Sequence, residues 1–272
     1  MQSDPHDLFD VSGDVVVLTG VAGQLGGRYA AALLARGARV AGLDVRRTPS
    51  VETLEQAWPH HFRFHAASIT DAAALRATVA TITGEWGVPT VLVNNAAIDA
   101  PPSAPPEETG PFETYPESSW DRVLDVNLKG TFLCCQVVGG AMAAAGRGSV
   151  INVASIYGVV APDQRIYDYR RERGEVFVKP VAYAASKSGV LNLTRYLAAY
   201  WAPRGVRVNT LTIAGVFNQQ DPEFLAAYCA RIPIGRMAAP DEYDGAVVFL
   251  ASAASRYMTG ANLVVDGGWT AI

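Results

Sequence analysis

The order of short apolar runs and helical stretches is the feature that most limits how this 272-residue chain can fold. Asp14–Gly20 (DVVVLTG) is a β-branched apolar run ending in a turn, which is typical of a strand buried on both faces. Similar runs then alternate with helical stretches. This order predicts an α/β fold with a doubly wound, parallel, seven-stranded sheet covered by helices on both faces. The predicted strands are Asp14–Gly20, Ala38–Asp44, His61–Ala67, Pro89–Ala97, Gly148–Ser155, Gly205–Ile213 and Ala261–Gly268. The predicted helices are Gln24–Gly37, Val51–Ala57, Asp71–Trp86, Ser118–Ala145 with Ser118 or Ser119 as its N-cap, Val181–Trp201 and Pro240–Ala253.

The composition favours a single domain, residues 1–272, with no linker or internal repeat. The chain is 50% hydrophobic and 18% charged, so a sizeable core can form. Its net charge of −4, without a basic block, argues against nucleic acid or a membrane as a partner. Cys134, Cys135 and Cys229 have no metal-ligand spacing, so no metal site is predicted. The N-terminus lacks a signal-peptide pattern and no apolar run reaches membrane-spanning length, so we expect a cytoplasmic protein.

A glycine-rich turn joins the first predicted strand to the first helix. In Thr19–Gly26 (TGVAGQLG) the glycines let the backbone approach a pyrophosphate, and the helix N-terminus supplies N–H groups to it. Asp44 ends the second strand, where a carboxylate can accept both ribose hydroxyls of NAD and repel the 2′-phosphate of NADP. Arg46 and Arg47 could soften this preference, so NADP stays possible. Both features also have an interpretation without a cofactor: the glycines would only allow tight packing, and Asp44 would only cap a helix or lie in a solvated turn.

Tyr183 and Lys187 are four residues apart in a predicted helix, so both side chains lie on one face. The pair is either an incidental surface contact or an acid with a tuned pKa. Two polar segments, Pro101–Glu117 and Pro162–Pro180, break the regular alternation and are predicted to be irregular. Both follow strand C-termini, where open α/β sheets bind ligands, and the second is a candidate substrate lid.

Together with the glycine turn, NNAA (Asn94–Ala97), Asn127, INVASIYG and YAASK resemble the short-chain dehydrogenase/reductase family, from about Ser12 to Thr270. The resemblance implies a single-domain Rossmann fold and a catalytic tetrad of Asn127, Ser155, Tyr183 and Lys187. Tyr183 would exchange a proton with the substrate oxygen, and a nearby charge from Lys187 would lower its pKa. Ser155 would hold the substrate oxygen, and Asn127 would hold a proton-relay water.

The resemblance also implies cofactor and substrate contacts. The turn has Gln24 where the family usually has glycine, and Ser68, Ala97 and Asn218 also depart from its common pattern. The implied cofactor contacts are Gly20, Gly23, Gln24, Leu25, Gly26, Asp44, Val45, Ser68, Ile69, Asn95, Ala96, Ala97, Tyr183, Lys187, Val216 and Asn218. The expected substrate contacts are Ser155, Tyr157, Tyr167 and Tyr183.

We therefore predict an NAD-dependent oxidoreductase that interconverts a secondary alcohol and a ketone on a small polar molecule. The insertion at 162–180 favours a polyhydroxylated or anionic substrate, and a partial similarity to polysaccharide and flagellin-glycan reductases favours sugars or cyclitols. The alternatives are an NADP-linked reductase of acyl thioesters or other hydrophobic ketones, an epimerase or dehydratase that recycles NAD, and a non-catalytic dinucleotide sensor or scaffold. The resemblance also implies a homo-oligomer, a tetramer or dimer, formed through the helices at Ser118–Ala145 and Val181–Trp201.

Overall fold

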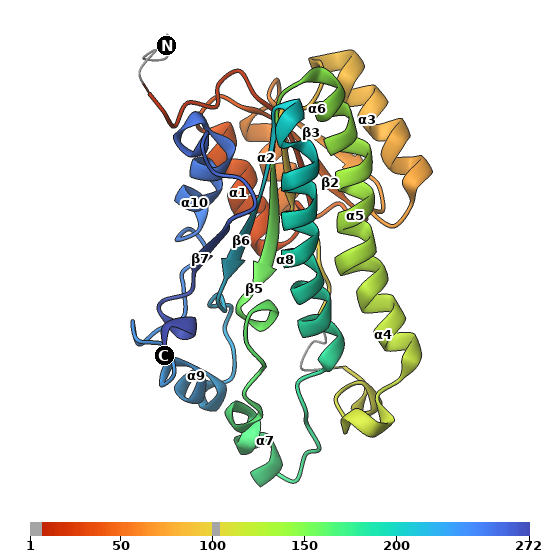
Figure 1. The fold of residues 1–272 in the computed structure, drawn as a ribbon. Helices are drawn as coiled ribbons and strands as arrows, with labels where there is room; N and C mark the ends of the chain where they lie inside the picture. The colour runs from red at the N-terminus through yellow and green to blue at the C-terminus, as the bar shows by residue number, and fades with distance from the viewer. Residues whose placement is uncertain (1–6, 100–103) are drawn as a thin grey trace.

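The computed structural model describes residues 7–99 and 104–272, and its centre is a parallel sheet (Figure 1). The sheet has seven strands in the order β3-β2-β1-β4-β5-β6-β7, with every neighbouring pair parallel. The strand order runs outward in one direction from β1 to β3 and in the other from β4 to β7, so the fold is doubly wound, as predicted. The strands are β1 (Val15–Thr19), β2 (Arg39–Asp44), β3 (Phe62–Ala66), β4 (Val91–Asn94), β5 (Gly148–Ser155), β6 (Val206–Ile213) and β7 (Asn262–Val265).

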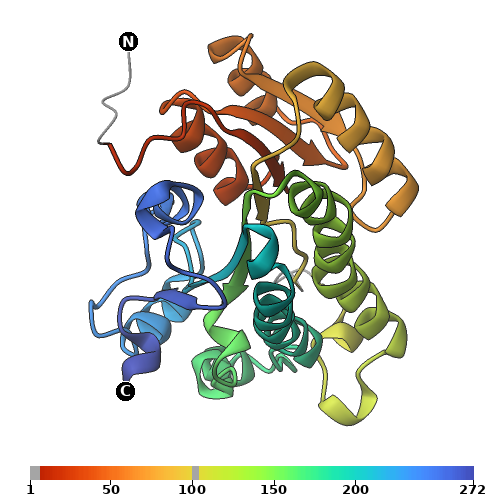
Figure 2. The same ribbon diagram turned by 45° about the horizontal axis from the view of Figure 1, so that its top comes forward.

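Helices cover both faces of the sheet (Figure 1, Figure 2). They do so because the strands present apolar side chains to both faces. On one face, α1 (Gln24–Leu34), α2 (Pro49–Ala57) and α10 (Asp244–Ala251) contribute to a single buried cluster. On the other face, α3 (Ala72–Trp86), the long helical segment Glu117–Ala145 and α8 (Val181–Trp201) form the second cluster. Asp71 caps α3, since its carboxylate accepts hydrogen bonds from the N–H groups of Ala73 and Ala74.

The segment Glu117–Ala145 is helical throughout but not uniformly α-helical. It consists of α4 (Glu117–Leu124), a π-helical turn Asp125–Gly130, α5 (Thr131–Cys134), a second π-helical turn Cys135–Gly139 and α6 (Gly140–Ala145). Its N-cap is Pro116, so the predicted serine cap is wrong: the fixed φ of proline, −64°, starts the helix one residue before Ser118. The expectation about apolar runs also needs correction, because this segment is long and apolar enough to cross a membrane by length and composition. Here Cys134, Cys135, Val138 and Met142 pack on the sheet instead.

The structure differs from the predicted elements in four places. The segment 162–180 is not irregular throughout, since it contains a 3₁₀ turn, Gln164–Tyr167, and α7 (Asp168–Glu172). The segment 101–117 contains two 3₁₀ turns, Pro106–Glu108 and Phe112–Thr114, while positions 100–103 lie outside the described residues. An unpredicted helix, α9 (Pro222–Cys229), follows β6, and the predicted helix Pro240–Ala253 is confined to α10. Both α7 and α9 lie beyond the strand ends (Figure 1).

Candidate active site

The turn after β1 holds its shape through backbone contacts that require glycine. Gly20 has φ +71°, a left-handed conformation, and its N–H donates to the carbonyl of Leu43 at 2.8 Å. A Cβ atom on Gly26 would lie 2.0 Å from the Gly20 carbonyl oxygen, so α1 can only meet the turn this closely with glycine there. Gly23 is less constrained, since its Cβ would lie 3.4 Å from the same oxygen. The result is an open cradle at the N-terminus of α1, suited to a phosphate.

A cavity of about 400 Å³ extends from this cradle along the ends of β1, β2 and β4. Asp44 lies in its wall, where Oδ2 accepts from the N–H of Ala22 at 3.0 Å and Oδ1 from the N–H of Arg46 at 3.2 Å. These bonds fix the carboxylate at the end of β2, in the wall of a cavity that begins at the glycine cradle. Of the predicted cofactor residues, those that line it are Gly20, Gly23, Leu25, Gly26, Asp44, Val45, Ser68, Ile69, Asn95, Ala96 and Ala97.

Gln24 does not line this cavity, although it was predicted to contact the cofactor. Its Nε2 donates to the carbonyl of Phe217 at 3.1 Å, which ties the glycine turn to the segment after β6. Val216 and Asn218, on that segment, line a neighbouring cavity together with Tyr183. The predicted cofactor residues therefore divide between two cavities, while Lys187 is buried and lines neither.

The second cavity, of about 700 Å³, contains the predicted reacting groups. Ser155 is the last residue of β5, and Tyr183 lies in the first turn of α8. All four predicted substrate residues, Ser155, Tyr157, Tyr167 and Tyr183, line this cavity. The structure thus brings together a hydroxyl and a phenol from segments 28 positions apart in the sequence.

Burial dominates the electrostatics of the tyrosine and lysine. Burial raises the pKa of the Tyr183 phenol, the Asp99 carboxylate raises it further, and a hydrogen bond with Ser155 lowers it. Burial also lowers the pKa of Lys187 to about 8, which the Asp99 charge opposes. Lys187 Nζ lies 5.8 Å from the Tyr183 ring centroid and donates to the Val153 carbonyl at 2.8 Å. The effect of Lys187 on the pKa of Tyr183 therefore stays a prediction.

Asn127 is buried in the first π-helical turn, and its amide is already used by protein partners. Its Oδ1 accepts from the N–H of Ile98 at 2.8 Å, and its Nδ2 donates to the Ile98 carbonyl and to Ser186 Oγ. These bonds connect the segment after β4 to α8, so Asn127 positions two walls of the site. Its backbone carbonyl accepts from Thr131 Oγ1 at 2.8 Å. A proton-relay water at Asn127 stays a prediction.

Several charged residues of the second cavity were not predicted from the sequence. Asp99 and Lys179 line it and form an ion pair close to Tyr183, with Lys179 Nζ 5.5 Å from the tyrosine ring centroid. One signal was available for Asp99, because it follows the Asn94–Ala97 motif at a strand C-terminus. No comparable signal marks Lys179, since its position depends on how the lid folds back.

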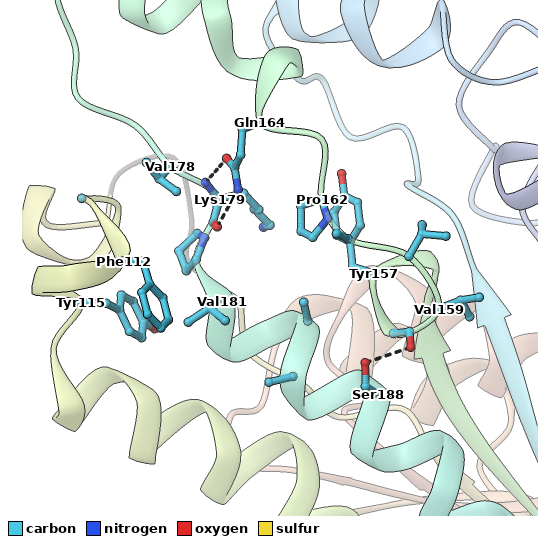
Figure 3. Close-up of a pocket in the computed structure, with 17 residues that line it drawn as sticks. Phe112, Tyr115, Tyr157, Val159, Pro162, Gln164, Val178, Lys179, Val181 and Ser188 are labelled. Atoms are coloured by element: carbon cyan, nitrogen blue, oxygen red, sulfur yellow. Dashed lines mark hydrogen bonds between the residues drawn. The ribbon is translucent and has the colours of Figure 1, made fainter. Parts of the chain in front are cut away.

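A third cavity, of about 510 Å³, lies beside the two ends of the lid, residues 162–164 and 178–180 (Figure 3). None of the predicted catalytic residues lines it. Its lining is mainly apolar, with Phe112 and Tyr115 opposite the segment after β5. Gln164 joins the two ends of the lid here. Its Oε1 accepts from the N–H of Lys179 at 2.8 Å, and its Nε2 donates to the carbonyl of Lys179 at 3.3 Å. These two bonds fix the backbone of Lys179 at the boundary between the two cavities.

Comparison with known proteins identifies the family. Residues 20–270 match the family model described as "Enoyl-(Acyl carrier protein) reductase". D-threitol dehydrogenase of Mycolicibacterium smegmatis is 36% identical over 269 residues, covering 96% of this chain and 95% of that protein. NAD-dependent glycerol dehydrogenase of Listeria innocua is 30% identical over 267 residues, covering 96% of each. A gluconate 5-dehydrogenase structure from Burkholderia cenocepacia, in complex with NADP and tartrate, aligns with a TM-score of 0.84 at 29% identity and covers 98% of both chains. The chain therefore belongs to the short-chain dehydrogenase/reductase family, and it is an oxidoreductase.

Proposed function

We propose that the protein is an NAD-dependent dehydrogenase that interconverts a secondary alcohol and a ketone on a small polyhydroxylated substrate. The observation that carries the proposal is the position of Ser155 and Tyr183, which lie in a cavity lined by both charged and aromatic side chains, next to a glycine cradle suited to a dinucleotide. Relatives named for threitol and glycerol support a polyol as the substrate class.

The residues of the second cavity have distinct roles in this proposal. A nicotinamide bound beside these residues would accept or supply the hydride. Tyr183 Oη takes the proton of the substrate hydroxyl in oxidation, and returns it to the oxygen in reduction. Ser155 Oγ hydrogen-bonds the same oxygen, which stabilises the charge that develops there. Lys187 lies one turn further along α8, where its ammonium would favour the phenolate and contact the nicotinamide ribose.

Asp44 favours NAD over NADP in this proposal. Its carboxylate is fixed in the wall of the first cavity, where it can accept the ribose hydroxyls and repel a 2′-phosphate. Arg46 also lines this cavity and moderates the preference. NADP therefore remains the second cofactor to be tested.

The alternative functions make different demands on the second cavity. A reductase of acyl thioesters needs an apolar channel, whereas charged side chains of the lid, together with Asp99 and Asp221, line this cavity. A sensor or scaffold has no need of a tyrosine and serine set together in a cavity. An epimerase or dehydratase that recycles NAD would use the same tyrosine without net NADH formation. A role in polysaccharide or flagellin-glycan synthesis would require turnover of a nucleotide-linked sugar.

We also propose that the protein works in the cytoplasm as a homo-oligomer. Cys134, Cys135 and Cys229 are unpaired thiols, which suits a reducing compartment. The face formed by Glu117–Ala145 and α8 carries exposed aromatic side chains, which suits contact with another copy.

The proposal is tested by NADH formation from NAD with a panel of polyols, sugars, cyclitols, aldonates, nucleotide-linked sugars and simple secondary alcohols. We expect turnover of at least one polyol. The Tyr183→Phe variant should lose about a hundredfold to ten-thousandfold in kcat while its NAD affinity is retained. Near-normal turnover by this variant would refute the role of Tyr183. Tight NAD binding with no turnover of any compound would favour the sensor or the recycling enzyme.

A further inference from the structure

The charged side chains that line the described part of the second cavity are equally divided between the two signs. Three are acidic and three are basic, and each basic group is paired with an acidic one. The pairs are Lys179 with Asp99, Arg170 with Glu175, and Arg173 with Asp221. The cavity wall therefore has no net charge, although six ionised groups belong to it.

The two arginines have little capacity left for a substrate anion. Both Nε and NH2 of Arg170 lie 2.6 Å from Glu175 Oε2, and its guanidinium lies 4.2 Å from the Phe177 ring centroid. Arg173 uses NH1 on Asp221 at 3.2 Å and NH2 on Glu223, so both ends of its fork are occupied. Recognition of a carboxylate or phosphate generally uses such a fork in bidentate form. Glu175 occupies the Nε and NH2 edge of Arg170, and two carboxylates occupy the NH1 and NH2 edge of Arg173.

Lys179 is the remaining cation, and Asp99 neutralises it beside Tyr183. The Lys179 side chain is only 10% exposed, and its backbone is held by Gln164 (Figure 3), so the ammonium cannot easily turn away to solvent. Lys187 does not line the cavity and donates to the Val153 carbonyl. Without the Asp99 charge, Lys179 would be a largely buried, unpaired cation 5.5 Å from the Tyr183 ring centroid, which would favour binding of a substrate carboxylate.

Paired groups can still bind hydroxyls. A carboxylate has about four lone-pair sites and an ammonium has three N–H donors, so one ion pair leaves acceptors and donors on both partners. A neutral polyol, which both donates and accepts through each hydroxyl, matches such a wall. An aldonate or sugar phosphate would add a negative charge without finding an uncompensated cation.

We infer that the cavity selects uncharged polyols over sugar acids and phosphates, and that Asp99 sets this selectivity by neutralising Lys179. The inference rests on the proposed function and narrows its substrate class. Asp99 and Lys179 act as specificity-determining residues, and Gln164 acts as a positioning residue for Lys179.

The test compares kcat/KM for an alditol and for the aldonate of the same chain length and stereochemistry, such as threitol and threonate. We expect the wild-type enzyme to prefer the alditol. In Asp99→Asn the ratio of alditol to aldonate should fall about tenfold or more, since Lys179 then lacks its partner. The Asp99 charge also shifts the pKa values of Tyr183 and Lys187, but this changes kcat/KM for the alditol and for the aldonate alike and cancels in their ratio. In Lys179→Gln the ratio should not fall, since the cation is gone.

Asp125→Asn is the matched control, because it breaks an exposed lysine–aspartate pair with Lys129 outside the cavity. Its ratio should equal that of the wild type. Where Asp99→Asn turns over too slowly, calorimetry of aldonate binding to the NAD complex gives the same comparison, with tighter binding expected in the variant. A wild-type preference for the aldonate, or an unchanged ratio and unchanged aldonate affinity in Asp99→Asn, would overturn the inference and leave the dehydrogenase assignment intact. Absence of turnover on either compound class would instead reject the proposed function.

Discussion

The side chains of Tyr183 and Lys187 illustrate how burial and spacing act together at a single site. Their i,i+4 spacing brings both to one face of α8, as the sequence predicts. The spacing does not determine the direction of the ammonium, which donates to the Val153 carbonyl of β5. Because Lys187 is buried, its charged form is destabilised, and this has a measurable effect on folding.

We predict that the free energy of unfolding of the wild type rises with pH above pH 8, relative to Lys187→Met. Burial lowers the folded-state pKa of Lys187 from 10.5 to about 8, so between these values the unfolded chain binds more protons than the folded chain. Stability should therefore increase by about 1 kcal/mol per pH unit in that window, and should be independent of this group below pH 8. Urea unfolding of both proteins from pH 7 to pH 9.5 measures the difference. Parallel curves would show that Lys187 titrates alike in both states.

Asp44 gives a second prediction at the scale of one residue. In Asp44→Ala, NAD binding should weaken about tenfold to a hundredfold, the usual cost of losing hydrogen bonds to a charged acceptor. NADP binding should weaken less or improve, so the gap between the two dissociation constants should narrow. Arg46→Ala is the opposite control, because it should weaken NADP more than NAD. An unchanged ratio of dissociation constants in Asp44→Ala would show that another group selects the cofactor.

At the scale of elements, the lid and α9 form one packed unit. Tyr167 of the lid lies 4.7 Å from Phe177 and 5.7 Å from Phe224 of α9, measured between ring centroids. Arg173 and Arg231 add ion pairs between the two segments, to Asp221 and Glu223 and to Asp163. The exposed pairs contribute little energy each, so the aromatic contacts hold the unit together. Lid and α9 should therefore open together.

We predict that Phe177→Ala loosens the lid and α9 by the same amount. Phe177 is buried, and loss of its ring should lower the local opening free energy by about 2 to 3 kcal/mol in both segments. Hydrogen exchange should accelerate together at residues 163–178 and 221–230, while the sheet and NAD affinity stay unchanged. Phe112→Ala is the matched control, because Phe112 is 70% exposed and its loss should change neither segment. Faster exchange in the lid alone would show that the two segments open separately.

At the scale of the molecule, the sheet was predictable because local and global signals agree. Each predicted strand overlaps an observed one, since buried β-branched runs have few alternatives in a chain of this pattern. Helix α9 was not predictable from its own eight residues. It depends on Asp221, which accepts from the N–H of Glu223, and on the stacking of Tyr228 with Trp269, which lies far along the chain.

The residues of the candidate site likewise include some that the sequence predicts and some that it does not. Residues of the glycine turn, Ser155 and Tyr183 were predictable because they occupy strand ends and one helical turn, which the topology places at a common edge. The partners of Gln24, Asn127 and Lys187 were not, because each hydrogen-bonds a backbone group of another segment. The charge balance of the second cavity depends on ion pairs such as Asp99 with Lys179, 80 positions apart, and only the tertiary structure reveals it.

The face of Glu117–Ala145 and α8 gives the last prediction. Phe132, Tyr196 and Tyr200 are 45%, 65% and 56% exposed there. A groove lined by Leu128, Phe132 and Leu193 lies on the same face. Large apolar side chains gathered on one face usually mark a contact between chains. The Phe132→Asp substitution would place a charge in that contact and separate the chains. The molar mass of the variant, measured by light scattering, should fall to a half or a quarter of the wild-type value, and its NAD affinity should be retained. Tyr257→Asp, at a fully exposed ring in a turn, should leave the mass unchanged. A wild-type chain that is already monomeric, or a Phe132→Asp variant of wild-type mass, would place the oligomer contact elsewhere or remove it.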